Sequence, residues 1–468
     1  MGRRNLANLK KTIYYLKKNG LRSTWYAARE KLEQEKAAPY VFEGVSKEKW
    51  NEQRNWAKKE KEQGRKLPII SIVVPAYRTP EAYLRQLLDS LLQQSYPYWQ
   101  LVLADATEDD RVEKAVAEYR DRNSCRDKDS CRDRDSRICY VHLKENGGIS
   151  ANSNQALAYV TGDFTGLLDH DDILAEDALY EVAVRIVKAA QEGTGIGMLY
   201  SDEDKCGDAE FEYFEPNYKE KFNLDLILGN NYICHFLVIE STLLKELKFR
   251  QEYDGAQDYD LILRAAERLL PEEERIVYVP KVLYHWRSHA LSTAENPLSK
   301  EYAYEAGLKA VQDFADRQGW GAKAVSLQHP GFYRLEYPKP PLEHRADLAA
   351  VGGRVLHRGK IAGGRWTEEG TLLYEGLPAF HSGYLHRAML SQDADAVDIR
   401  CIQVREECRE IFEKETGVIY KELPDKQIFD ISLLPEGTDI KNLSIALGRA
   451  FRKAGYRILY LPTMTVEV

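Results

Sequence analysis

The sequence lacks any apolar run long enough to cross a membrane, and it has only seven cysteines. A membrane helix needs about 20 apolar residues, and the N-terminus also lacks the pattern of a signal peptide. The cysteines are odd in number and include no Cys-x-x-Cys pair, which argues against a disulfide framework and against a zinc site. We therefore expect a protein of the reducing cytoplasm.

An excess of positive charge is also missing. The net charge of −8 argues against a nucleic-acid partner. The 468 residues, of which 44% are hydrophobic and 30% charged, are enough for two or three packed domains.

The N-terminal segment departs from this acidic balance. Residues 1–29 contain eight Lys or Arg and no Asp or Glu, and their apolar residues recur at a loosely helical spacing. A basic amphipathic helix of this kind either lies on the anionic inner face of the plasma membrane or packs on protein, and the sequence leaves both open. Together with the charge-rich residues 30–66, it is predicted to form a helical N-terminal extension, residues 1–66.

Apolar strand segments alternate with amphipathic helical segments in the next part of the chain. Strands are predicted at 69–74, 101–105, 138–142 and 164–168, with helices at 80–94, 109–121 and 149–160 between them. Repeated strand–helix units are typical of a parallel, doubly wound α/β sheet. We expect this domain to cover residues 67–325, with a solvated loop insertion at the Ser-Cys-Arg-Asp repeats after residue 123.

Acidic residues follow the ends of these predicted strands. Asp105 ends the second strand, and Asp169 and Asp171 follow the strand at 164–168. Ligands of open α/β sheets bind at the carboxyl ends of the strands, and carboxylate oxygens suit Mg²⁺ or Mn²⁺. The pair predicts a cation site able to hold a diphosphate, although such a motif alone is more often a surface turn. Asp202-Glu203-Asp204 is a rival site.

Several motifs, taken in order, resemble the family 2 glycosyltransferases of the GT-A fold. They are Val74-Pro75-Ala76-Tyr77, Asp105, Asn146-Gly147-Gly148 with Asn154, Asp169-His170-Asp171-Asp172, Gln257-Asp258 and Tyr284-His285-Trp286-Arg287. The resemblance covers about residues 68–295. It implies a GT-A fold, a doubly wound, mostly parallel, Rossmann-like sheet, and transfer of a sugar from a nucleotide-sugar to a glycan. It further implies a bacterial cell-surface polysaccharide or lipid-linked glycan as acceptor, and UDP is favoured over dTDP as the nucleotide.

The resemblance also implies a role for each motif residue. Pro75, Ala76, Tyr77, Asp105 and Asn154 would bind the nucleotide, Asp169, Asp171 and His285 would hold Mn²⁺ or Mg²⁺, Asp258 would be the catalytic base, and Arg287 and Ser292 would contact the diphosphate.

Two departures and several structural alternatives stand beside these roles. Where many members of the family have Ala-Arg-Asn, this chain has Asn152-Ser153-Asn154, which removes one arginine on the phosphate side. Gln257 replaces the glutamate that usually precedes the base. Taken singly, Asp258 is also a typical helix N-cap residue, and His285 is also a typical hydrogen-bonded histidine at a strand end.

The chemistry of sugar transfer follows from the same residues. A cation neutralises charge on the leaving diphosphate, and a carboxylate takes the proton of the acceptor hydroxyl. One base without a second, nucleophilic carboxylate predicts a single displacement that inverts the anomeric centre. The alternative is a pseudo-transferase that scaffolds a glycan-assembly complex. A nucleotidyltransferase is disfavoured, because residues 75–80 are not a basic, glycine-rich phosphate loop.

The C-terminal third repeats part of the sequence pattern of the first domain. A Pro-rich linker is predicted at 326–341, followed by a domain at 342–468. At a constant offset of 182, Leu261–Pro280 falls on Leu443–Pro462, whereas the position of Asp258 becomes Ile440 and that of His285 becomes Glu467. We expect a degenerate, non-catalytic, transferase-like accessory domain for acceptor binding or assembly, with chance similarity as the alternative.

The basic N-terminal segment gives a first test. If residues 1–29 dock on membrane, the full chain should sediment with anionic liposomes and the chain without these residues should not, because each Lys or Arg near the surface contributes about 1 kcal/mol. Neutral liposomes are the control. Equal binding by the truncated chain would contradict surface docking.

Overall fold

The computed structural model describes residues 16–17, 20–22, 24–26, 28–29, 40–124, 135–207, 212–288 and 301–468. The chain divides into two compact units. The larger unit contains residues 40–222 and 231–310, and the smaller unit contains residues 1–39, 223–230 and 311–468. Residues 223–230 therefore belong to the smaller unit, although the chain on either side of them belongs to the larger one. The predicted domain boundaries stay a prediction.

The larger unit alternates strands and helices along most of its length. Its elements are α2 (Lys47–Glu62), β1 (Ile70–Ala76), α3 (Glu81–Leu92), β2 (Trp99–Asp105), α4 (Arg111–Ser124), β3 (Ile138–His142), α5 (Ile149–Leu157), β4 (Phe164–Leu167), β5 (Ile173–Leu174), α6 (Ala178–Gln191), β6 (Met198–Cys206), β7 (Tyr213–Asn217), β8 (Leu237–Glu240), α8 (Ser241–Leu247), α9 (Gln257–Leu269) and β9 (Ile276–Arg287), with 3-10 turns at Gln251–Tyr253 and Leu270–Arg275. Helix α10 (Glu301–Arg317) begins in this unit and ends in the smaller one.

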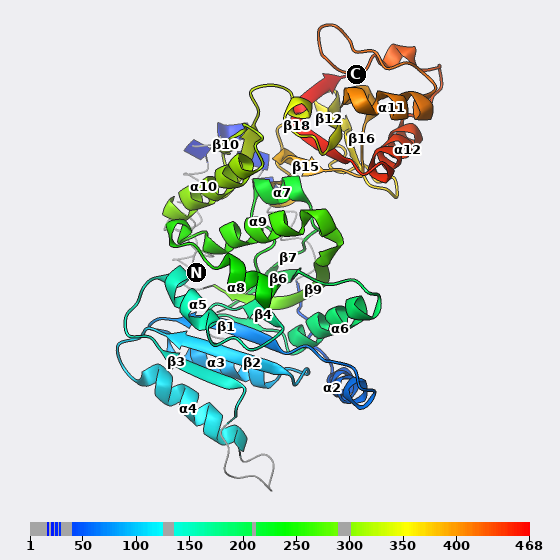
Figure 1. The fold of residues 1–468 in the computed structure, drawn as a ribbon. Coiled ribbons are helices and arrows are strands. Elements are labelled where there is room, and N and C mark those ends of the chain that lie inside the picture. Colours follow the sequence, from blue (N-terminus) through cyan, green and yellow to red (C-terminus); the bar gives the residue numbers. More distant parts are fainter. Residues whose placement is uncertain are drawn as a thin grey trace. The chain divides into compact units, whose positions relative to one another are not determined.

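Among the described residues, the strands of the larger unit form one sheet of nine. Their order is β3-β2-β1-β4-β8-β6-β9-β5, with β7 paired to β6. Strands β1 to β4 are parallel neighbours, β9 is parallel to β6, and β8 runs antiparallel between β4 and β6. Figure 1 shows β1, β2 and β3 side by side. The predicted fold class, an α/β fold with a mostly parallel sheet, is confirmed.

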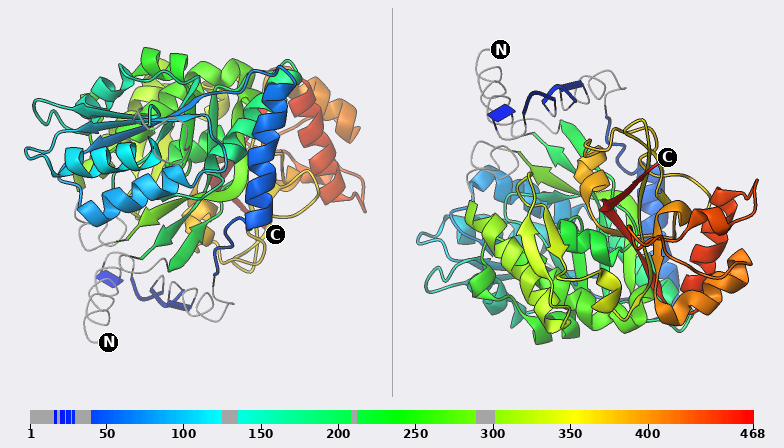
Figure 2. Two further views of the ribbon diagram at one scale, coloured as in Figure 1. Left: turned by 90° about the horizontal axis from the view of Figure 1, so that it is seen from below. Right: turned by 90° about the horizontal axis from the view of Figure 1, so that it is seen from above.

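Helices cover both faces of this sheet (Figures 1 and 2). Leucines and alanines of α3, α4 and α6 pack with β1 and β2 in one buried cluster. Helix α5 contacts β1 and β2, and α8 contacts β4 and β8. Because the strands have helices on each side, they read in the sequence as continuous apolar runs and not as alternating ones.

The register of the parallel strands brings acidic residues to one edge. Ala76, the last residue of β1, is level with Asp105 at the end of β2, and Val73 is level with Leu167 at the end of β4. The chain therefore leaves all three strands at the same edge of the sheet, and Asp169 follows two residues after β4. This is the ligand-binding edge expected for an open α/β sheet.

The smaller unit contains short strands and two longer helices. Its elements are α7 (Leu224–Gly229), β10 (Lys323–Ser326), β11 (Tyr333–Glu336), β12 (Leu348–His357), β13 (Lys360–Gly363), β14 (Arg365–Trp366), β15 (Gln392–Asp393), β16 (Ala396–Val397), β17 (Ile402–Val404), α11 (Arg409–Thr416), α12 (Ile440–Lys453) and β18 (Arg457–Glu467), with 3-10 turns at Pro341–Glu343, Tyr384–Met389, Ile399–Cys401, Glu406–Cys408 and Ile431–Leu433. Strand β11, paired to β10, lies within the segment predicted as a linker.

The strand pairing of the smaller unit repeats half of the larger sheet. Strand β12 pairs parallel to β18 and antiparallel to β17 and β13. In the larger unit, β6 pairs parallel to β9 and antiparallel to β8 and β7. Helix α12 and strand β18 also lie where the predicted echo of α9 and β9 puts them. The described part of the smaller unit has no counterpart of the β1–β4 half.

Buried charges hold α7 in the smaller unit. The Arg345 guanidinium, whose side chain is fully buried, pairs with Asp225 of α7 at 2.5 Å and with Asp347 at 2.7 Å. Asp393 accepts from the backbone N–H of Leu224 at 2.7 Å, and burial beside Asp225 raises the pKa of Asp393 well above its usual value. Removing one partner of a buried pair leaves an uncompensated charge.

Within the described parts of the chain, no helix combines the length and the apolar character needed to span a bilayer. The predicted helix at residues 1–29 lies mostly outside the described residues. Helix α2, in the predicted extension, packs on the larger unit: Gln53 donates to Asp177 at 3.2 Å, and the rings of Trp56 and Tyr180 meet edge to face.

The Arg345 contacts generate a stability prediction. Arg345→Met should lower the free energy of unfolding by about 3–5 kcal/mol, because it leaves Asp225 buried without its cation. Urea unfolding of the full chain measures the change. The matched control is Lys339→Met: this side chain is 67% exposed in its pair with Glu343, so its loss should cost at most about 1 kcal/mol. Equal effects of the two changes would contradict the role given to Arg345.

Candidate active site

A pocket with about 520 Å³ of empty space, including the part open to solvent, lies at the predicted edge of the larger unit. It is lined by Val73, Pro75, Ile149, Ser153, Leu167, Leu168, Asp169, Cys234, His235, Leu237, Phe249, Gln257 and Asp258. Three lining residues, Pro75, Asp169 and Asp258, are predicted site residues. The structure thus brings the acid after β4 and the acid of α9 to one pocket, although they are far apart in the sequence.

Asp258 lies in the first turn of α9. Its Oδ2 accepts a hydrogen bond from the side-chain amide of Asn231 at 3.1 Å. The start of the helix is fixed by Asp260, whose buried carboxylate pairs with Arg250 and with Arg264. Asp258 is therefore held at the pocket by a helix with an anchored first turn, and a carboxylate placed in this way can accept a proton.

The acidic motif after β4 divides into a structural acid and a pocket acid. Asp172 is buried, and its carboxylate accepts from the Tyr284 hydroxyl at 2.5 Å and from the Arg287 backbone N–H at 2.7 Å. Burial, together with the charges of Asp171 and Asp169, raises the pKa of Asp172 well above its usual value. The Asp169 side chain is 48% exposed and lines the pocket. Asp172 thus fixes the turn that presents Asp169.

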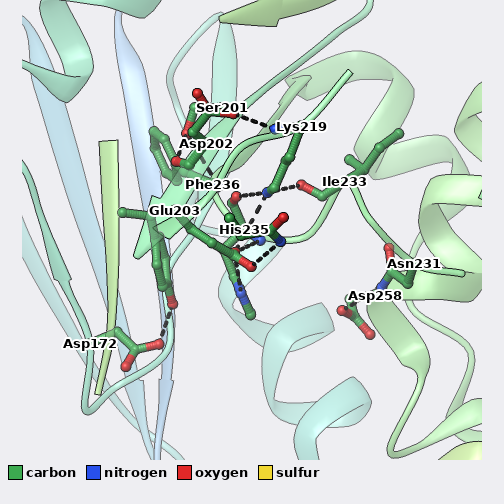
Figure 3. Close-up of polar contacts among 12 residues, drawn as sticks. Asp172, Ser201, Asp202, Glu203, Lys219, Asn231, Ile233, His235, Phe236 and Asp258 are labelled. Carbon is green, nitrogen blue, oxygen red and sulfur yellow. Dashed lines mark hydrogen bonds and ion pairs between the residues drawn. The ribbon is translucent and has the colours of Figure 1, made fainter. Parts of the chain in front are cut away.

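His235 is a pocket residue that the sequence analysis did not select. Its Nε2 lies 3.9 Å from Asp169 Oδ2, and its ring stacks on Tyr284 with centroids 4.6 Å apart. Glu203 accepts from the His235 backbone N–H and lies 3.3 Å from Nδ1 (Figure 3). Burial alone would lower the pKa of His235, but Glu203 and Asp169 raise it to about 9. The available signal was a histidine inside the largely apolar run at 226–239, and a run of this kind ordinarily indicates core.

His285 is a predicted metal ligand that the structure does not bring to this pocket. Its ring is buried, its Nδ1 lies 2.5 Å from Asp204 Oδ1, and it packs between Phe42 and Tyr213. Successive side chains of a strand point to opposite faces. Tyr284 faces His235, so the next residue of β9 faces away from it. Asp204 also accepts from the Tyr40 hydroxyl at 2.8 Å.

The rival acidic cluster of β6 is split in the same way. Glu203 faces His235, whereas Asp204 faces His285. Asp202 accepts from the Tyr278 hydroxyl at 2.7 Å and from the backbone N–H of Lys219 at 2.7 Å. The three acids therefore serve three separate contacts.

The predicted nucleotide residues lie at the ends of β1 and β2. Asp105 is buried and accepts from the Thr107 backbone N–H at 2.9 Å and from the Tyr140 hydroxyl at 3.0 Å. Ala76 is buried beside it, and Tyr77 is half-buried, with its hydroxyl 3.1 Å from Glu108. Their common position at the sheet edge agrees with a nucleotide site, and their role stays a prediction.

Asn154 and Ser153 occupy neighbouring positions on α5 with different surroundings. The Asn154 amide is engaged on both sides by the backbone of Phe249, donating at 2.8 Å and accepting at 2.9 Å. This contact braces the loop before α9, and it leaves the predicted nucleotide role of Asn154 without a supporting contact. Ser153, in the place of the expected arginine, lines the pocket and leaves it open.

Of the two predicted diphosphate residues, Arg287 lies within the described part of the chain. Arg287 is buried, with its Nε donating to the Asp171 carbonyl at 2.6 Å and its guanidinium over the ring of Tyr83. Its two terminal nitrogens are buried and have no hydrogen-bond partner among the described residues. An unsatisfied guanidinium suits an anionic ligand. Ser292 lies outside the described residues.

A divalent cation fits the acids of this edge in number and type. Across the described chain, no group of three or more His, Cys, Asp or Glu could hold a metal by itself. Mg²⁺ usually takes one or two carboxylates and completes its shell with water and substrate phosphates. Asp169 and Asp171 supply that number, so they fit a cation that arrives with a diphosphate.

The Tyr284 contacts generate a prediction for this edge. Tyr284→Phe removes the hydroxyl that donates to Asp172 and accepts from the Asp169 backbone N–H at 3.3 Å. It should lower the free energy of unfolding by about 1–3 kcal/mol, because the buried Asp172 carboxylate loses one of its two donors and keeps only the Arg287 backbone N–H. Urea unfolding measures it, with Tyr159→Phe, at a position 48% exposed, as the control. An equally small loss of unfolding free energy in both variants would contradict the role given to the Tyr284 hydroxyl.

The chain is similar in sequence to several known proteins. Residues 71–247 match the sequence model described as glycosyl transferase family 2. The uncharacterized protein y4gI of Sinorhizobium fredii is 35% identical over 62% of this chain and 32% of its own length. The O-antigen biosynthesis protein RfbC of Myxococcus xanthus is 31% identical over 58% of this chain and 20% of its own. The chain thus spans a third or less of these relatives.

Solved structures are similar at lower identity. The crystal structure of S. aureus TarS 1-349 in complex with UDP-GlcNAc covers 52% of this chain and 66% of the TarS chain. The sequence identity is 21% and the TM-score is 0.39. The family match ends before Asp258, so the acid of α9 joins the site through the fold and not through the matched segment. Residues 71–247 of this chain are thus similar to a family 2 glycosyltransferase domain.

Proposed function

We propose that the larger unit is a metal-dependent, inverting glycosyltransferase. It transfers a sugar from a nucleotide-sugar to a hydroxyl of a cell-surface polysaccharide or lipid-linked glycan. The observation that carries the proposal is the single pocket lined by Asp169 and Asp258, one able to meet a diphosphate and its cation, the other able to take a proton. The family match of residues 71–247 supports the reaction class.

The donor binds along the edge formed by β1, β2 and β4. The ends of β1 and β2, with Ala76, Tyr77 and Asp105, receive the nucleoside. Arg287 and the acids after β4 receive the diphosphate, and the two unpartnered nitrogens of Arg287 support this assignment. UDP is the first candidate nucleotide and dTDP the second.

Asp169 and Asp171 hold Mg²⁺ or Mn²⁺ together with the diphosphate. When bound, the cation neutralises the charge that develops on the leaving group. Arg287 adds to this effect, because its guanidinium lies close to the same acidic motif. His285 has no part in this set, since its ring pairs with Asp204 on the other face of β9.

Asp258 acts as the general base. Its carboxylate takes the proton of the acceptor hydroxyl, the acceptor oxygen bonds to the anomeric carbon, and the bond from that carbon to the diphosphate oxygen breaks. The other acid of the pocket lining is Asp169, which is assigned to the cation. With no carboxylate left to act as a nucleophile in the lining, a single displacement follows, and the anomeric centre is inverted.

The smaller unit is proposed as a non-catalytic accessory module for acceptor binding or assembly. Its strand pairing repeats the half of the larger sheet that carries the base helix α9. Ile440 stands at the start of α12, where α9 has Asp258, so the repeat keeps the framework without the acid. The name of the Myxococcus relative supports a surface polysaccharide as the product class.

The alternative is a pseudo-transferase that scaffolds a glycan-assembly complex. The specific observation in its favour is Ser153, which replaces the phosphate-side arginine at the pocket. A panel of UDP-, dTDP- and GDP-sugars separates the two. The enzyme should release free nucleotide with Mn²⁺ or Mg²⁺ and lose this activity in EDTA, whereas a scaffold releases none under either condition.

The base assignment has its own prediction. Asp258→Asn should reduce transfer to acceptor about 10²- to 10⁴-fold, because the amide cannot accept the proton. Binding of the nucleotide-sugar should be unchanged, since Asp258 does not meet the diphosphate. Calorimetry measures binding and free-nucleotide release measures transfer, with the exposed Glu252→Gln as control. Transfer at the normal rate would remove Asp258 from the base role.

A further inference from the structure

Residues of the loop at 231–236 contact both acids of the pocket, Asp169 and Asp258. At its start, Asn231 donates to Asp258, and near its end His235 lies beside Asp169. Cys234 and His235 both line the pocket. The proposed function assigns no role to these loop residues. The position of the loop at the pocket therefore needs a separate explanation.

A buried ion pair clamps this loop from behind. The Lys219 ammonium donates to the backbone carbonyl of Ile233 at 2.9 Å and to that of His235, and it lies 3.5 Å from Glu203. The Lys219 side chain is 0% exposed and that of Glu203 is 10% exposed. Figure 3 shows Lys219 and Glu203 converging on the loop at His235.

Stability alone does not account for this pair. Well-packed neutral side chains of similar volume often serve as well as a buried ion pair or better, because both charges must leave water. What the charges add here is orientation. Glu203 holds His235 through both its backbone N–H and its Nδ1, and Tyr284 stacks on the ring. A carboxylate that fixes one ring nitrogen in this way orients the other toward a ligand.

The free ring nitrogen faces an open position. His235 Nε2 is 3.9 Å from Asp169 Oδ2, which is too far for a direct hydrogen bond but close enough for both atoms to contact the same ligand. The ring is otherwise enclosed by Tyr284 and by Trp286, whose centroid lies 5.8 Å away. Among the described residues, Tyr284, Trp286 and Glu203 contact the other sides of the ring, so Nε2 is the side that faces the pocket.

We propose that His235 is a further donor-site residue, whose Nε2 meets the diphosphate and its cation, and that Glu203 and Lys219 are the residues that position it. This inference rests on the proposed function and extends it to a residue outside the sequence motifs. The imidazole reaches either a phosphate oxygen or the cation that the phosphates carry, and the two contacts differ in their dependence on metal.

Calorimetry with nucleotides of different phosphate content tests the role of His235. The full chain and His235→Asn are titrated with UDP, UMP and uridine, and with the dTDP and GDP series, in Mn²⁺ and in EDTA. His235→Asn should weaken binding of the diphosphate about ten- to a hundredfold, because a contact to a charged group is lost. Binding of the nucleoside should not change. A loss that persists in EDTA assigns the contact to phosphate oxygen, and a loss confined to Mn²⁺ assigns it to the cation.

A neutral replacement of the ion pair tests the positioning role. Glu203→Gln and Lys219→Met should each lower the melting temperature, because the first leaves the Lys219 charge buried without its carboxylate and the second removes a buried cation from Glu203. The double variant should recover most of that loss and still bind the diphosphate about tenfold more weakly than the unaltered chain. Adding His235→Asn to it should weaken binding little further, since the ring is already unpositioned. His357→Asn, at an exposed histidine whose Nδ1 meets the C-terminal carbonyl, is the control and should bind as the unaltered chain does.

The outcomes separate this inference from the function on which it rests. If the unaltered chain binds no nucleoside diphosphate, the proposed function is overturned and the inference with it. If the unaltered chain binds one and His235→Asn binds it equally well, the inference alone is overturned. A stable double variant with undiminished diphosphate affinity would remove Glu203 and Lys219 from the positioning role.

Discussion

The parallel pairing of β1 with β2 and β4 is the constraint on which the site depends. Parallel strands end at the same edge of a sheet, so the chain segments that follow them meet there whatever their separation in sequence. In this chain the pairing places the ends of β1 and β2, with Asp105, on the edge that the chain reaches again after β4, with Asp169. Helices pack on both faces of these strands, which are therefore buried on each side.

A second constraint, the two-residue period of a strand, decides which polar residues reach the pocket. Glu203 and Tyr284 are level on β6 and β9 and face His235, whereas Asp204 and His285 are level on the same strands and face the Tyr40 side. A shift of one residue exchanges the two sets. Two buried polar clusters therefore lie back to back, one at the pocket and one beneath the segment that carries Tyr40 and Phe42.

The smaller unit repeats part of the strand pairing of the larger sheet without the acid of α9. Strands β12, β13, β17 and β18 pair as β6, β7, β8 and β9 do, yet its helix α12 begins with isoleucine where α9 carries Asp258. The unit also includes α7, a segment from the middle of the larger unit's sequence, and neutralises its Asp225 with Arg345.

The α/β fold, the strands that end in acids, and the repeat of α9 and β9 in the last third could be predicted from the sequence, because they follow from local signals: apolar period, strand ends and segment spacing. The joint candidacy of Asp169 and Asp258 follows from the resemblance of the motifs to family 2 glycosyltransferases. The sequence did not predict that His235, and not His285, lies beside Asp169, or that the Asn154 amide bonds to the backbone of Phe249. The reason is that these outcomes depend on the face of a strand and on a partner distant in the chain. The local sequence around a histidine in an apolar run indicates neither its face nor its distant partner. In the folded chain, contacts with Glu203, Lys219 and Tyr284 orient the His235 ring and its loop.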